Sequence, residues 1–332
     1  MEIWRPGDYS WNWRKSEGVV KKFDMITGFA RLTGFVLAAS LLAACSMPST
    51  ITSERRALLI GINDYIYLPA DNQLHSAEND ATELNKILKE TGWLEPEMLN
   101  NGTIGKADIK NKIQDFGNHI DNGETALIYF SGHGNIDDTE AYMVASDSTV
   151  ADVNSQISVT EFSSWIQDYI YVKTENIILI IDACFSGSFI KESDSVDLIE
   201  PEYDIYTSNT VSTPALAGMS EYASLLAKNF NMGGRLNPII ISAAGASEES
   251  YEDSSLTISE DSQSGQGVFT YYLIESAKKG DTNKDGYISC TEAYTYASKS
   301  VDKNWNEYNG NSRAYYPHIS GGLRDMVLFD LH

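Results

Sequence analysis

Two short stretches of the sequence carry the residue types needed for thiol chemistry. In residues 176–188, N-I-I-L-I-I-D-A-C-F-S-G-S, Cys184 follows an unbroken apolar run. In residues 125–134, T-A-L-I-Y-F-S-G-H-G, His133 stands between two glycines at the end of a second run. Each run is short enough for a strand buried on both faces. If the two strands are parallel neighbours, Cys184 and His133 emerge at the same edge of the sheet.

An imidazole beside a thiol can take the thiol proton, and the resulting thiolate can attack a carbonyl carbon. Taken alone, Cys184 would be read as a buried cysteine in a turn, because free cysteine usually behaves as a small hydrophobic residue. Taken alone, His133 is consistent with a turn histidine. The paired placement at two strand ends favours the catalytic interpretation.

The surrounding sequence predicts the elements that would position this pair. Strand and helix patterns alternate, which predicts an α/β fold with a mostly parallel central sheet and helices on both faces. Strands are predicted at 56–62, 125–131, 141–144, 177–181 and 238–244, with a last edge strand at 326–329. Helices are predicted at 76–92, where Ser76 is the N-cap, and at 106–120, 158–171, 268–279 and 292–305. Residues 190–237 and 247–267 interrupt the alternation and are predicted to be loops.

Composition excludes one class of partner. The 332 residues carry a net charge of −23, and such an acidic chain argues against nucleic-acid binding. The length allows one large α/β domain or two small ones. The same charge weakly favours basic substrates.

The N-terminal region is predicted to contain an export signal. An apolar run at 35–44 follows Arg31 and ends directly before Cys45. It is too short to span a bilayer. The sequence L-A-A-C ending at Cys45 resembles the bacterial lipobox, which implies cleavage before Cys45 and a lipid on its sulfur. An ordinary signal peptide or a small buried helix is the alternative, and translation could start at Met1 or Met25.

These features predict how the chain is divided and where it is located. We expect an extension and lipoprotein signal peptide at 1–44, a tether at 45–54 and one peptidase domain at 55–332. The mature protein would be an exported lipoprotein, anchored to a membrane through Cys45 on the periplasmic or cell-surface side.

Six motifs appear in an order that resembles the caspase-like cysteine peptidases, most closely their metacaspase and bacterial branch. They are R-A-L-L-I-G-I-N-D-Y, A-E-N-D-A, Y-F-S-G-H-G, I-I-D-A-C-F-S-G-S, I-I-I-S-A-A and G-V-F-T-Y-Y-L. The resemblance implies a three-layer α/β/α sandwich that hydrolyses peptide bonds with a His/Cys dyad. It makes Cys184 the nucleophile and His133 the general base and acid. Backbone N–H groups of Cys184 and Gly132 would hold the oxyanion.

The same resemblance implies a specificity. Metacaspase-like members carry one acid two residues before the cysteine and another in the first helix, and these match Asp182 and Asp80. Two carboxylates in one pocket would select protein or peptide substrates with Arg or Lys before the cut. Asp80 could instead be a solvated acid at a helix start, and Asp182 a turn-forming acid. Another preference, such as asparagine, or a catalytically idle interaction module are the alternative functions.

The loop at 190–237 lies where caspase-like enzymes are cut between their large and small subunits. Its basic residues are Lys191, Lys228 and Arg235. Lys191 is too near the catalytic turn, so we expect any self-cleavage after Lys228 or Arg235.

Residues 281–292, D-T-N-K-D-G-Y-I-S-C-T-E, fit the EF-hand loop pattern. The oxygen ligands predicted for Ca²⁺ come from Asp281, Asn283, Asp285, the Tyr287 carbonyl, Ser289 or its water, and Glu292. A calcium-free turn held by its own side-chain-to-backbone bonds is the alternative.

Overall fold

The structure is a computed structural model that describes residues 53–136, 140–149, 151–184, 237–244, 248–259, 265–310, 314–320 and 325–332. The chain divides into two units, Met1–Thr50 and Ile51–His332. All described residues belong to the second unit, which contains every helix and strand named below.

A mostly parallel sheet forms the centre of this unit, as the sequence predicted. Its main path runs β11-β7-β6-β3-β1-β2, and β4 and β5 extend from β3. Each neighbouring pair on the path is parallel except β11 with β7. The strands are β1 (Arg55–Gly61), β2 (Glu97–Leu99), β3 (Thr125–Ile136), β4 (Ala141–Met143), β5 (Ile157–Ser158), β6 (Asn176–Cys184), β7 (Ile239–Ser242) and β11 (His318–Ser320).

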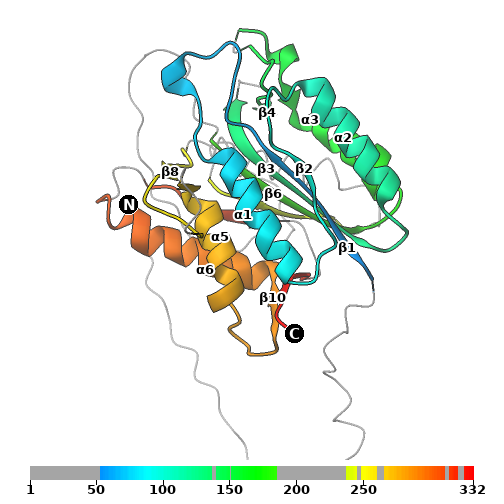
Figure 1. The fold of residues 1–332 in the computed structure, drawn as a ribbon, viewed down its shortest axis with the longest axis vertical. Helices are drawn as coiled ribbons and strands as arrows, with labels where there is room; N and C mark the ends of the chain where they lie inside the picture. Colours follow the sequence, from blue (N-terminus) through cyan, green and yellow to red (C-terminus); the bar gives the residue numbers. More distant parts are fainter. Residues whose placement is uncertain are drawn as a thin grey trace, which may run out of the picture. The chain divides into compact units, whose positions relative to one another are not determined.

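Helices cover both faces of this sheet, so the predicted three-layer α/β/α sandwich is confirmed (Figure 1). One layer contains α1 (Ala77–Glu90), α5 (Val268–Lys279) and α6 (Cys290–Val301), which continues into the π-helical turn η5 (Asp302–Asn306). The other contains α2 (Lys106–His119), α3 (Val159–Trp165) and the π-helical turn η3 (Ile166–Tyr171). Short 3-10 turns, η1 (Ala70–Asn72) and η2 (Val153–Ser155), lie in the connections.

The alternation along each strand builds a separate core against each helix layer. In β6, Ile177 and Leu179 belong to the core under α2 and α3, whereas Ile178 and Ile180 belong to the core under α1, α5 and α6. All four side chains are fully buried. Because β6 is covered on both faces, it reads in sequence as a continuous apolar run.

Two short pairings differ from the sequence predictions. Within 247–267, predicted as a loop, β8 (Glu252–Asp253) pairs antiparallel with β9 (Gln266–Gly267). The last strand, β12 (Val327–Asp330), does not join the edge of the main sheet. It pairs antiparallel with β10 (Tyr287–Ser289) in a sheet of its own. Two-residue strands have no periodicity to detect, and a local pattern does not specify the partner of a strand.

The start of α1 is stabilised from outside the helix. Ser76 occupies the N-cap position, but its side chain makes no capping hydrogen bond. The carboxylate of Glu252 instead accepts hydrogen bonds from the backbone N–H groups of Ser76, at 2.7 Å, and of His75, at 3.0 Å. A carboxylate at a helix N-terminus is favoured by the helix dipole and by the unpaired N–H groups there. The β8–β9 hairpin is therefore fastened to the first turn of α1.

Candidate active site

His133 and Cys184 stand opposite each other at the ends of two adjacent parallel strands. Ser131 pairs with Asp182 in the β3–β6 register, and His133 pairs with Cys184 as its last pair. The long apolar runs before them align these strands, because a register shift would displace the eight preceding pairs of the same ladder. The two residues therefore come together at the carboxyl edge of the sheet.

His133 is held by a backbone carbonyl and a tyrosine. Its Nε2 lies 2.8 Å from the carbonyl oxygen of Asn72, and its backbone N–H donates to the Tyr65 hydroxyl at 2.7 Å. The ring centroids of Tyr65 and His133 are 4.6 Å apart. A carbonyl oxygen can only accept, so Nε2 carries the proton and Nδ1 is the basic nitrogen. The ring is thus oriented with a defined tautomer.

Burial favours the neutral form of this imidazole. Burial lowers the pKa of His133, and the hydrogen bond to Asn72 offsets part of that effect. The side chain is only 8% exposed. A neutral imidazole with a free-base nitrogen has the protonation state that a general base requires.

Sequence reasoning missed both supports of His133. Asn72 acts through its carbonyl, which any residue could supply, so no side-chain signal identifies it. Tyr65 ends the first motif, but only the fold shows that it reaches His133. Its hydroxyl also explains Gly132, because a Cβ at Gly132 would lie 2.8 Å from that oxygen.

Asp80 and Asp182, far apart in sequence, meet beside Gly267. An ideal Cβ built on Gly267 would lie 2.7 Å from Asp80 Oδ2 and 2.9 Å from Asp182 Oδ2. Asp80 comes from α1, Asp182 from the carboxyl end of β6, and Gly267 from the start of α5. The two acidic side chains are 1% and 4% exposed. A glycine at position 267 is what lets the backbone approach both carboxylates.

Every donor in the observed hydrogen bonds to these two carboxylates is neutral. Gly267 N–H and the Ser131 hydroxyl donate to Asp80, at 2.8 and 3.1 Å. The hydroxyls of Ser250 and Thr270 donate to Asp182, at 2.7 and 2.6 Å. Among the described residues, no lysine or arginine forms an ion pair with either acid. Within that part of the chain, the acid pair has no internal counter-charge.

Burial and mutual repulsion disfavour two negative charges in this space. Burial raises the pKa of Asp80 well above its usual range, and the charges of Asp182 and Glu252 raise it further. Burial also raises the pKa of Asp182, although its hydrogen bonds oppose the change. Two coupled carboxylates of this kind share a proton when no cation is present. A cation entering between them would relieve the repulsion.

Glu252 adds a third acidic group that sequence reasoning did not select. Burial raises its pKa, and the amides of Ser76 and His75 lower it. The available signal was the acidic composition of 247–267, which did not distinguish one carboxylate from another. Ser131 was not selected either. It lies two residues before His133 on β3, and residues at that spacing lie on the same face of a strand, so strand alternation was the signal that could have found it.

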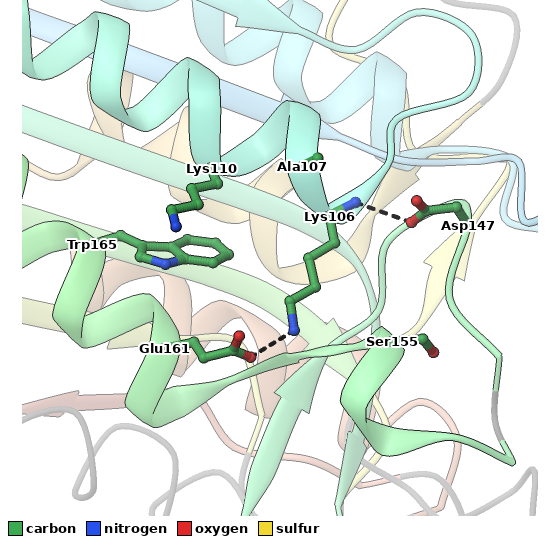
Figure 2. Close-up of a pocket in the computed structure, with 7 residues that line it drawn as sticks. All are labelled: Lys106, Ala107, Lys110, Asp147, Ser155, Glu161 and Trp165. Atoms are coloured by element: carbon green, nitrogen blue, oxygen red, sulfur yellow. Dashed lines mark hydrogen bonds and ion pairs between the residues drawn. The ribbon is translucent and has the colours of Figure 1, made fainter.

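A cavity of about 400 Å³ lies elsewhere, over α2 and α3. Figure 2 shows Lys106 reaching Glu161 across it, with Lys110 above the Trp165 ring. The Lys106 ammonium donates to Glu161 at 2.7 Å and to the carbonyls of Asn154 and Gln156. Its three N–H groups are thus used in joining α2 to its neighbours. No residue of the His133 and Cys184 site lines this cavity.

The 281–292 loop lies between α5 and α6 and is folded around its own oxygens. Asp281 accepts from the N–H groups of Lys284 and Gly286, Asn283 from that of Asp285, and Asp285 from that of Tyr287. The Glu292 carboxylate accepts from Thr282, and Ser289 caps α6. Within the part of the chain that the structure describes, no three Asp, Glu, His or Cys side chains converge on one point. The predicted donor set, however, includes neutral oxygens and consists of oxygen throughout, which suits a hard cation such as Ca²⁺.

Three predicted features fall outside the described residues. Cys45 and the segment 1–44 lie there, as do residues 190–236 with Lys191, Lys228 and Arg235. The backbone of Cys184 is described as the end of β6. Within the described ranges, no helix is long and apolar enough to span a membrane.

Comparison with known proteins gives one family. The family model of the caspase domain matches residues 54–327. A search of curated proteins found no match. A crystal structure of a Geobacter sulfurreducens protein covers 81% of this chain and 93% of its own, with 13% identity and a TM-score of 0.46. That likeness is too low to transfer anything from one protein to the other.

Proposed function

Because the chain belongs to the caspase domain family, whose members are cysteine peptidases, we propose that it is a cysteine endopeptidase that cuts after Arg or Lys. The observation that carries the proposal is the position of the buried Asp80–Asp182 pair beside the ends of β3 and β6. A dyad and a pocket for a cation are then parts of one site.

The dyad performs the proton transfers of both halves of the reaction. His133 Nδ1 takes the proton of the Cys184 thiol, and the thiolate attacks the substrate carbonyl carbon. The imidazolium, stabilised by the Asn72 carbonyl, then gives the proton to the departing amine as the peptide bond breaks. Water, deprotonated by His133, then attacks the thioester carbonyl carbon. The C–S bond breaks, the new carboxyl group is released, and the imidazolium returns the proton to the Cys184 sulfur. Backbone N–H groups of Cys184 and Gly132 are the proposed donors to the oxyanion.

The acid pair selects the residue before the cut. A guanidinium or ammonium group placed near Asp80 and Asp182 would supply the counter-charge that no described lysine or arginine provides. A planar guanidinium can bridge two carboxylates, so arginine substrates should be better than lysine ones. A neutral side chain would leave the repulsion in place.

The experiment is a panel of fluorogenic peptides ending in Arg, Lys, Asn or Asp, tested on wild-type protein and three variants. Cys184→Ala and His133→Ala should each abolish hydrolysis. Asp182→Asn should lower kcat/KM for Arg substrates by about 30-fold to several-thousand-fold, since losing one buried charge partner costs about 2–5 kcal/mol. In that variant the thiol should still react with iodoacetamide.

The same panel separates the alternatives. A preference for Asn or Asp would overturn the assignment of the acid pair while leaving the dyad in place. A thiol that reacts with alkylating agents but turns over no peptide, with or without calcium, would favour the interaction module.

We propose in addition that the 281–292 loop binds Ca²⁺ through Asp281, Asn283, Asp285, Tyr287, Ser289 and Glu292. The supporting observations are the loop fold and its flanking helices α5 and α6. Gly286, at loop position 6, has φ +82°, a conformation that glycine adopts without strain. Bound calcium would supply charge to order the loop, and α5 would link that order to Thr270 in the acid pocket. Calorimetric titration with calcium tests the binding.

Anchoring is a separate proposal that rests on sequence alone. Cleavage before Cys45 and lipidation of its sulfur would place the enzyme on a membrane as an exported lipoprotein. Intact-mass analysis of membrane-extracted protein tests it, and a mature chain that still begins at Met1 or Met25 would contradict it.

A further inference from the structure

Two large apolar side chains are exposed directly beside the supports of His133. Ile66 is 57% exposed and Tyr67 is 61% exposed. They follow Tyr65, whose ring contacts the His133 ring. Single exposed apolar residues are ordinary, but these two are consecutive and directly follow a residue that contacts His133.

The loop that carries this pair is braced rather than loose. Gln73 accepts from the backbone N–H of Tyr65 at 2.6 Å and donates to the carbonyls of Tyr65 and Leu68, each at 3.0 Å. The backbone N–H of Ile66 donates to the Ser146 carbonyl at 2.9 Å. The two side chains are therefore presented from a fixed backbone, which lowers the ordering cost of any contact they make.

The chemistry of the dyad indicates which part of a substrate passes this loop. His133 must give its proton to the departing amine, so the segment after the cut leaves on the His133 side. The loop from 63 to 74 occupies that side, because Tyr65 and Asn72 both contact His133. The residue before the cut is held elsewhere, beside Gly267 between α1 and α5.

We propose that Ile66 and Tyr67 form a subsite for an apolar or aromatic residue at the first or second position after the cleaved bond. This inference rests on the proposed peptidase function and deepens it. The loop also exposes Asp64 and Asp71. Their charges would repel an acidic substrate residue after the cut. The side chains of Ile66 and Tyr67 would instead bury part of an apolar residue, which is favourable.

The test uses two substrate types with the full chain. One is a short peptide that ends in an Arg methylamide, so that neither a residue nor an aromatic ring follows the cut, and its cleavage is measured by mass spectrometry. The other is a set of internally quenched peptides that carry Leu, Phe, Ser or Asp at the two positions after Arg. Wild-type protein should cleave the Leu and Phe peptides with kcat/KM about tenfold above the Ser peptide, and the Asp peptide should be poorest.

Ile66→Ser combined with Tyr67→Ser should remove this tenfold preference and leave hydrolysis of the Arg amide unchanged. Val172→Ser is the matched control, because Val172 is 62% exposed and lies after η3, away from this loop. It should change neither activity. Equal wild-type rates for Leu, Ser and Asp peptides would overturn the subsite, as would a double variant that keeps the preference. Absence of turnover of both substrate types by wild-type protein would instead overturn the proposed function, and this inference with it.

Discussion

The hydroxyl of Thr270 donates a 2.6 Å hydrogen bond to Asp182. Thr270 lies in the first turn of α5, and the last turn of the same helix leads into the 281–292 loop. Since Thr270 also contacts the Tyr129 hydroxyl at 2.7 Å, it joins β3, β6 and α5 at one point. The acid pair is thus connected by a single helix to the proposed calcium loop.

Thr270→Val should test what this hydroxyl contributes. Valine has nearly the same shape but leaves the buried Asp182 and Tyr129 groups without this partner. We expect a loss of about 1–3 kcal/mol in the free energy of unfolding, measured by urea denaturation. Thr270→Ser keeps the hydroxyl and should retain most of the stability. Equal stability of the Val and Ser variants would contradict the assignment.

Replacing Asp80 of the buried pair should make the protein more stable relative to wild type as the pH rises. Burial raises the pKa of Asp80 above its unfolded value, so its contribution to stability is present below the unfolded pKa and is lost as pH rises through the folded pKa. Asp80→Asn removes that loss, and the Tm of the variant minus that of wild type should increase as the pH rises above about 4. In a domain of this size each kcal/mol corresponds to about 2–4 °C. Calorimetry measures the Tm values, and Asp115→Asn, at an exposed position, is the control for loss of an acid outside the pair.

The rate at which the Cys184 thiol is alkylated should fall at low pH (the acid limb of its pH profile), and this fall should begin below the pKa of an ordinary histidine. Burial lowers the pKa of His133, so the imidazole remains a free base to lower pH than in solution. The rate of Cys184 alkylation by iodoacetamide should therefore fall only below about pH 6.5. A limb above that value would mean that the charged imidazole is favoured in the site. In His133→Ala the thiol has no base beside it, so the fall in rate should move up to the ordinary thiol range, at about pH 8.5.

Calcium should stabilise the chain through Glu292. A ligand that binds only the folded state adds about 2.7 kcal/mol at 100 times its dissociation constant. Glu292→Gln should weaken the calcium-dependent rise in Tm most, because Glu292 is expected to supply two oxygens. Glu307→Gln, at an exposed position, serves as the matched control and should behave as wild type. No heat and no thermal shift at millimolar calcium would leave the loop as a turn only.

The sheet and its helices were predictable because their patterns are long. Residues 177–181 read as a buried strand, and the spacing of Ala81, Leu84 and Leu88 marks one face of α1, where all three are fully buried. The strand ends then followed from the parallel arrangement. The β8–β9 pairing did not, because two residues carry no period. The partner of β12 did not, because the apolar pattern of a strand fits several partners.

The candidate site divides in the same way. Side chains with distinctive chemistry, such as His133 and Asp182, can be selected from sequence. Asn72 acts through its backbone, and Glu252 was one acid among many, so their positions depend on tertiary contacts. The neutral donors Ser250 and Thr270 carried no signal, since serine and threonine are common at such positions.

The pairing of β6 with β7 has a consequence for any backbone cut between residues 185 and 236. The four register pairs from Ile178↔Ile239 to Ile181↔Ser242 lie in the middle of the sheet, with β11 beyond them. A chain cut there would therefore be two polypeptides held together in one sheet. Separating them would expose the apolar core of each fragment to water. The two fragments should elute together from a size-exclusion column and separate only in denaturant. A denaturing gel would show two bands for what is one complex in solution.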